Sequence, residues 1–158
     1  MHPTGGDASL LHRESTFEFV AQAPLQRVAP LFGADAERVW EPEWNPTFLW
    51  PQPAQDRRGM VFTVQHGASR VPWVSTQFDL EAGRIQYVYV VAETMVTVIT
   101  LRLKAEGQTT RVRVDYDRTA LSSEANHLVA SMAQHDEQSG PIWDHQINAY
   151  LVKSKANG

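Results

Sequence analysis

The sequence contains no cysteine. Disulfides, thiolate zinc sites and thiol nucleophiles are therefore excluded. It has 14 Lys and Arg against 18 Asp and Glu, and no basic run is longer than Arg57-Arg58. Because a nucleic-acid partner requires a basic face, the net charge of -4 argues against nucleic acid as a partner.

Long apolar runs are also missing. No segment approaches the roughly 20 apolar residues that span a bilayer, so we expect no stable membrane insertion. The first segment, MHPTGGDASLLHRESTFEF, has neither a basic start nor an apolar stretch of signal-peptide length. We therefore expect a cytoplasmic protein.

The chain length and composition favour one globular domain. The chain has 158 residues, of which 42% are hydrophobic and 20% are charged, which is ordinary for a soluble domain. Residues 1–13 are rich in glycine and polar residues, so we expect a flexible N-terminus there. The single domain is expected over residues 14–155, as a monomer or a homodimer.

Most of the chain has the pattern of β-strands. The segment STFEFVAQAP alternates between apolar and polar residues and predicts a strand with one buried face. Two short helices are expected after it, because Pro30 and Gly33 interrupt the helical spacing. From Met60 to Leu121 the chain is rich in β-branched and aromatic residues, with short connectors typical of antiparallel hairpins.

The segment from Ser122 to about Lys155 predicts a long C-terminal helix. Apolar residues recur there at helical spacing, and Gly140-Pro141 is expected to kink or restart the helix. The predicted fold class is therefore α+β: a curled antiparallel sheet of about seven strands wrapped around this helix. A sheet curled around one helix leaves an internal cavity.

Three tryptophans and three prolines fall within VWEPEWNPTFLWP, from Val39 to Pro51. Proline removes backbone donors and keeps the preceding residue extended, so the segment predicts a stiff cover or an edge strand. Its aromatic side chains either wall the cavity entrance or fill the core. We expect Trp50 to touch a ligand.

Three segments give the chain its resemblance to a known superfamily. They are VWEPEWNPTFLWP, the hairpin VFTVQHG…VPWVSTQFD, and VDYDRTALSSEANHLV before the last helix. With their element order, they resemble the START-like or SRPBCC superfamily, which includes polyketide cyclase/dehydrase-like proteins. The likeness spans about residues 15–153. It implies the helix-grip fold and a cavity for a hydrophobic ligand, without a shared set of catalytic residues.

Strand parity predicts which side chains face the cavity. Aromatic and imidazole side chains with one polar tip suit a ligand that is mostly hydrocarbon with a few oxygens; the alternative is that they are ordinary core residues. The residues expected to bind the ligand are Trp50, Phe62, His66, Trp73, Tyr87, Tyr89, Tyr116, Arg118, Met132 and Trp143.

Arg118 is the charged member of this set. Counting along the last strand places it on the inner side, where a guanidinium requires a partner: Glu93, Asp136 or an anionic group of the ligand. The alternative is that the strand ends by Asp117 and that Arg118 reaches water.

The sequence predicts no metal site and no cofactor. His127, His135 and His145 are separated by eight and ten residues, which gives no paired metal-ligand spacing. A proton-transfer site is conceivable with His66, Tyr116 and Arg118 as candidates. Three functions stay open: binding of a hydrophobic small molecule, a cyclase or dehydratase reaction on such a molecule, and a chaperone-associated interaction protein.

Overall fold

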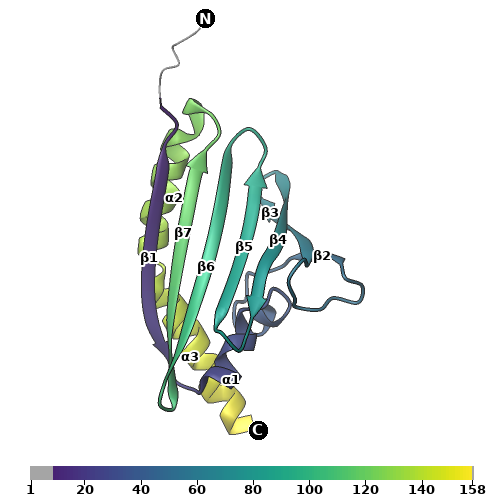
Figure 1. Ribbon diagram of the computed structural model, residues 1–158, viewed down its shortest axis with the longest axis vertical. Coiled ribbons are helices and arrows are strands. Elements are labelled where there is room, and N and C mark those ends of the chain that lie inside the picture. Colours follow the sequence, from purple (N-terminus) through teal and green to yellow (C-terminus); the bar gives the residue numbers. More distant parts are fainter. Residues whose placement is uncertain (1–8, 158) are drawn as a thin grey trace, which may run out of the picture.

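The computed structural model describes residues 9–157 and has a single seven-stranded antiparallel sheet (Figure 1). The strand order is β1-β7-β6-β5-β4-β3-β2. The strands are β1 (His12–Ala21), β2 (Thr47–Trp50), β3 (Val61–His66), β4 (Ser69–Asp79), β5 (Arg84–Val91), β6 (Met95–Glu106) and β7 (Thr109–Ala120). The predicted sheet of about seven strands is confirmed.

Short helices follow β1, as predicted. They are α1 (Leu25–Val28) and the 3₁₀ turns η2 (Ala29–Phe32) and η3 (Ala36–Val39). A further 3₁₀ turn, η4 (Ser123–Ala125), leads from the sheet into α2 (Asn126–Glu137) and α3 (Gly140–Asn157). In Figure 1, α2 and α3 run behind β1 and β7, where they cover one face of the sheet. This arrangement is the helix-grip fold.

The C-terminal segment consists of two helices rather than one. The break lies at the predicted position, because α2 ends at Glu137 and α3 begins at Gly140. Proline is tolerated in the first turn of a helix, where its missing N–H has no helical partner, so Pro141 fits the start of α3. Gly140 lies against Phe17, since an added Cβ would be 3.3 Å from that ring.

Residue alternation assigns one face of each strand to the core. On β7, Val112 and Val114 are fully buried, whereas Arg111 and Arg113 point to solvent. The register pairs Phe17 with Val114 across β1 and β7. The same alternation on β5 and β6 buries Tyr87, Tyr89, Thr97, Ile99, Leu101 and Leu103.

The first strand begins at His12, so the last part of the predicted N-terminal segment belongs to the sheet. Residues 1–8 lie outside the described residues. The predicted boundary between a flexible N-terminus and the domain, at residue 13, stays a prediction. Within residues 9–157, no helix has the length and apolar character needed to cross a membrane.

Candidate functional site

A small internal cavity lies between the inner face of the sheet, the segment after β1 and helix α3. Its volume is about 90 Å³, which is well below the roughly 300–1,000 Å³ of pockets for drug-sized ligands. Seven of its ten lining residues are aromatic. The lining residues are Phe32, Glu37, Trp44, Phe62, Trp73, Tyr87, Ile99, Leu101, Tyr116 and Trp143.

The segment rich in tryptophan and proline supplies part of this wall. Trp40 is buried, and its indole N–H donates to the carbonyl of Leu31 at 2.6 Å. Trp44 lines the cavity and donates to the carbonyl of Ala34 at 2.7 Å. These bonds fix both rings on the backbone around η2 and η3, because a buried indole N–H needs an acceptor.

Trp50 has a different environment from the other two tryptophans. It ends the edge strand β2, is 49% exposed, and lies under the guanidinium of Arg57 at 5.0 Å. It is not among the residues that line the cavity. Of the two predicted alternatives, a cover or an edge strand, the segment contains the edge strand β2. The contact of Trp50 with a ligand stays a prediction, and it would have to be made outside the cavity.

Glu37, on the turn η3, is the one charged residue among those that line the cavity. Burial, with the nearby carboxyls of Glu41 and Asp56, raises the pKa of Glu37 to about 8. The side chain is half-buried and also lines a groove on the surface. An acid in this environment changes its charge near neutral pH, which is the range required for proton transfer.

Two tyrosines also line the cavity. The Tyr87 hydroxyl donates to the carbonyl of Phe32 at 2.7 Å, and burial raises its pKa well above the usual range. Burial raises the pKa of Tyr116, and the carboxyls of Asp136 and Glu37 raise it further. Both phenols therefore stay protonated and can serve as hydrogen-bond donors or acceptors.

Arg118 is buried beside the cavity and not exposed at a frayed strand end. It is 4% exposed, and it binds Asp136 through Nε at 2.7 Å and a second nitrogen at 2.9 Å. Its remaining donors reach the Tyr89 hydroxyl at 2.7 Å and Thr97 at 2.9 Å. Burial lowers the pKa of Arg118, but the bonds with Asp136 outweigh burial and raise it. Of the partners considered from the sequence, Asp136 is the one present.

A second polar group next to Arg118 centres on His66. Its ring lies 5.1 Å from that of Tyr89, and the Tyr89 ring stacks on Trp73 at 4.4 Å. Burial and the charge of Arg118 lower the pKa of His66, which favours the neutral imidazole. Three buried polar atoms have no partner among the described residues: His66 Nε2, Trp73 Nε1 and Ser75 Oγ.

The structure divides the ten predicted ligand-binding residues into three groups. Five of them line the cavity: Phe62, Trp73, Tyr87, Tyr116 and Trp143. The adjoining polar group consists of His66, Tyr89 and Arg118. The remaining two do not line the cavity: Met132 packs against the core from α2, and Trp50 is exposed at the edge of the sheet. Of the three candidate catalytic residues, Tyr116 alone lines the cavity. Sequence analysis did not select Glu37, since an acid in a short helical turn usually faces solvent.

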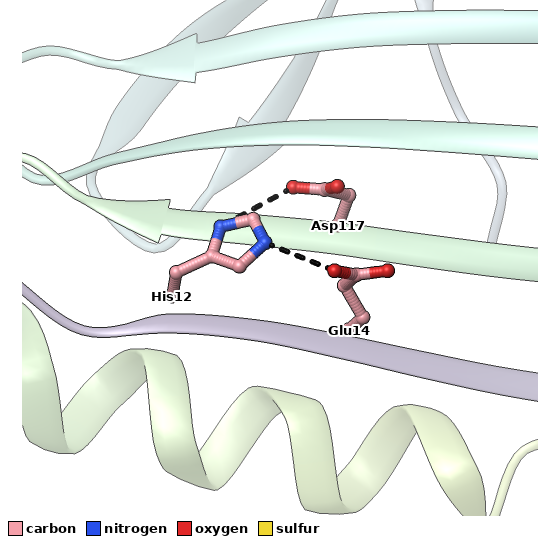
Figure 2. Close-up of side chains that lie close together, drawn as sticks. All are labelled: His12, Glu14 and Asp117. Carbon is pink, nitrogen blue, oxygen red and sulfur yellow. Dashed lines mark hydrogen bonds and ion pairs between the residues drawn. The ribbon is translucent and has the colours of Figure 1, made fainter.

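A histidine and two carboxylates also cluster on the outer face of β1 and β7 (Figure 2). His12 lies between Glu14, at 3.4 Å from Nε2, and Asp117, at 3.5 Å from Nδ1. The register places Glu14 opposite Asp117, a repulsive cross-strand pair unless a cation or donor lies between the two. The ring also bonds Thr119 through Nδ1 at 2.8 Å. The imidazole thus bridges the two strands as a surface contact, with the carboxylates on opposite ring nitrogens.

The fold and the cavity together define a protein of the helix-grip class. Norcoclaurine synthase from Thalictrum flavum, solved with dopamine and hydroxybenzaldehyde, has a TM-score of 0.66 at 8% identity, over 97% of this chain and 94% of that one. The Mll3558 protein from Rhizobium loti has a TM-score of 0.63 at 17% identity, over 90% of this chain and 99% of that one. Ara h 8.0201 has a TM-score of 0.62 at 13% identity, over 90% of this chain and 99% of that one.

These similarities concern the fold. Because all three are less than 25% identical to this chain, they confirm the helix-grip fold that the resemblance implied. The sequence matches no protein-family model and no curated protein.

Proposed function

We propose that this protein binds a hydrophobic small molecule in the cavity between the sheet and the C-terminal helices. The observation that carries the proposal is the aromatic wall: seven of the ten residues around a space of about 90 Å³ are aromatic. Apolar cavities of about 150 Å³ bind benzene, so a volume of about 90 Å³ suits a branched group smaller than a six-membered ring better than a lipid chain. Neighbours of the same fold, such as norcoclaurine synthase with its two aromatic ligands, support the proposal by analogy.

Two measurements test this proposal. Gentle-ionisation mass spectrometry of the purified protein looks for a small molecule that co-purifies with it. A panel of compact apolar molecules is then titrated while the five indole N–H signals are followed by NMR. We expect the signals of Trp44, Trp73 and Trp143 to move and that of Trp50 to stay. A panel that moves none of the three cavity indoles would overturn the proposal.

A second candidate function is an acid–base reaction on the bound molecule, of the cyclase or dehydratase kind. Glu37 and Tyr116 favour it, because both line the cavity and the pKa of Glu37 is about 8. If a co-purified ligand is converted on incubation, Glu37→Gln and Tyr116→Phe should each lower the conversion rate about 100-fold or more. Unchanged conversion in both variants would exclude these residues as the proton carriers.

The third function, a chaperone-associated interaction protein, has less support. The outer face of β6 and β7 carries ion pairs rather than an apolar patch, among them Arg102 with Asp115 and Arg111 with Glu106. A cytoplasmic location and a monomeric or homodimeric state stay predictions.

A further inference from the structure

The cavity combines two features that an ordinary apolar core does not have: a nearly complete aromatic wall and one carboxyl group. Glu37 provides the carboxyl, and no lysine, arginine or histidine is among the described residues that line the space. The nearest buried cation, Arg118, lies 4.9 Å from the Tyr116 ring and is already paired with Asp136. The charge inside the cavity is therefore negative whenever Glu37 is ionised.

The surroundings of Glu37 make its negative charge available to a ligand. Glu41 and Asp56 act on the Glu37 carboxyl as like charges, so a cation beside Glu37 gains from all three. Aromatic faces attract a cation within about 6 Å of the ring centroid, and the attraction is strongest where water is excluded. The Trp44 ring is in edge-to-face contact with Trp73, at a centroid distance of 5.5 Å, and with Phe62, at 6.0 Å. The three rings therefore form one continuous wall, and an ion in the cavity lies against it.

We propose that the cavity holds a methylated ammonium group, with the carboxylate of Glu37 as its counter-ion and the aromatic side chains as its walls. This inference rests on the proposed function and names the class of ligand. The volume of about 90 Å³ fits a group of about four heavy atoms, the size of a trimethylammonium group, when scaled from the 150 Å³ that hold benzene. The methyl groups contact the aromatic rings, and the positive charge pairs with the carboxylate of Glu37.

A surface groove adjoins the cavity, and two side chains lie between them. Glu37 and Trp143 line both the cavity and a surface groove, whose other residues include Glu41, Glu43, His135 and Gln146. A longer ligand with its ammonium group in the cavity would pass between these two side chains to reach the groove. The acidic residues of this groove also favour the approach of a cation.

Binding should be linked to the ionisation of Glu37. The charged or titratable groups around it come from several elements: Glu41, Glu43, Asp56, Tyr87, Tyr116 and His135. Because the pKa of Glu37 is about 8, most Glu37 side chains are neutral at pH 7, and a cation that requires the carboxylate must displace a proton. Tetramethylammonium has no proton of its own to lose, so any proton released on binding comes from the protein.

The test uses the full chain and two probes of equal size, tetramethylammonium and neutral tert-butanol, at constant ionic strength. Calorimetry in buffers of different ionisation enthalpy gives the affinity and the number of protons released, and the indole N–H signals report the site. We expect tetramethylammonium to bind about tenfold or more tightly than tert-butanol at pH 8.5. Its affinity should rise about tenfold per pH unit below pH 8, with about one proton released per ion at pH 6.5.

Two variants make the result decisive. Glu37→Gln should abolish both the proton release and the preference for tetramethylammonium while it keeps tert-butanol binding; its unfolding transition shows that it folds. Glu81→Gln, exposed on the turn between β4 and β5 and outside both the cavity and the groove, is the matched control and should behave as the natural sequence.

Different failures have different meanings. Equal binding of both probes, or tetramethylammonium binding that survives Glu37→Gln, would overturn the ammonium proposal and leave the proposed function intact. If neither probe binds, the ammonium proposal is wrong, and the apolar panel alone then decides the proposed function.

Discussion

Among single residues, Glu37 joins an apolar environment to a group that can ionise. Its folded-state pKa of about 8 lies above the ordinary value of 4.5, so between these two values the folded protein binds more protons than the unfolded chain. Stability then decreases as the pH rises through this window and levels off above it. The loss on ionisation is on the order of a few kcal/mol.

The variant Glu37→Gln should remove this pH dependence, because a neutral amide of similar shape takes the place of the protonated acid. Urea unfolding between pH 5 and 9 measures the effect. We expect the variant and the natural sequence to have similar stability near pH 5, and the variant to be more stable by about 2 kcal/mol or more at pH 9. Parallel stability curves for the two proteins would contradict the assigned environment.

The pair of Arg118 and Asp136 leads to a second prediction at this scale. Asp136→Asn leaves a buried guanidinium without its counter-charge and should lower the free energy of unfolding by about 3–5 kcal/mol. The double variant Arg118→Met with Asp136→Leu removes both charges and should recover at least half of that loss. It cannot recover all of it, because Tyr89 and Thr97 lose the donors of Arg118. A loss below about 1 kcal/mol in Asp136→Asn would show that water reaches the pair.

On regular strands, the alternation of side chains between the two faces made the inner residues predictable. The count along β7 placed Tyr116 and Arg118 on the inner side, and both are there. Parity carries no information on irregular segments, so it could not place Glu37 on η3 or Trp50 after the register shift in β2. Asp136 as the partner of Arg118 was one of several options, because choosing it requires the packing of α2 against β7.

At the scale of elements, the hairpin turns are where the backbone conformation is most restricted. Gly83, between β4 and β5, has a φ of +71°, and Gly107, between β6 and β7, has a φ of +65°. The two glycines differ in their surroundings. A Cβ on Gly83 would lie 2.2 Å from the carbonyl oxygen of Leu103, whereas Gly107 has open space around it.

This difference predicts unequal effects of the same substitution. Gly107→Ala should lower the free energy of unfolding by about 1–2 kcal/mol, which is the cost of a side chain at positive φ. Gly83→Ala adds a collision with the backbone of β6 and should lower it by about 2 kcal/mol more. Chemical denaturation of both variants measures the difference, and equal losses would show that the turn at Gly83 moves away from β6.

The elements themselves were largely predictable, because strand alternation and turn residues are local signals. The short connectors after Met60 gave the antiparallel order, and Gly140-Pro141 gave the break between α2 and α3. The size of the cavity was not predictable. It depends on how Trp40 packs against Trp143 and Trp44 against Trp73, at ring distances of 5.6 and 5.5 Å, and these contacts join segments far apart in the sequence.

At the scale of the whole molecule, the inner face of the sheet has a filled region and a hollow region. Leu101 and Leu103 lie on the same face of β6, and both are buried. Leu101 lines the cavity, whereas Leu103 is packed within the core near the turn of Gly83. The two positions therefore give a matched comparison of empty and occupied space.

A larger side chain should be tolerated at position 101 and should destabilise the fold at position 103. Leu101→Phe places the added atoms in the cavity, and we expect its free energy of unfolding to stay within about 1 kcal/mol of that of the natural sequence. Leu103→Phe has no such space and should lose about 1–3 kcal/mol. Leu101→Phe should also abolish tert-butanol binding, because the ring takes the volume that a ligand would fill. If Leu103→Phe abolished binding while Leu101→Phe preserved it, the ligand would have to lie elsewhere in the fold, and both the aromatic cavity and Glu37 would lose their assigned roles.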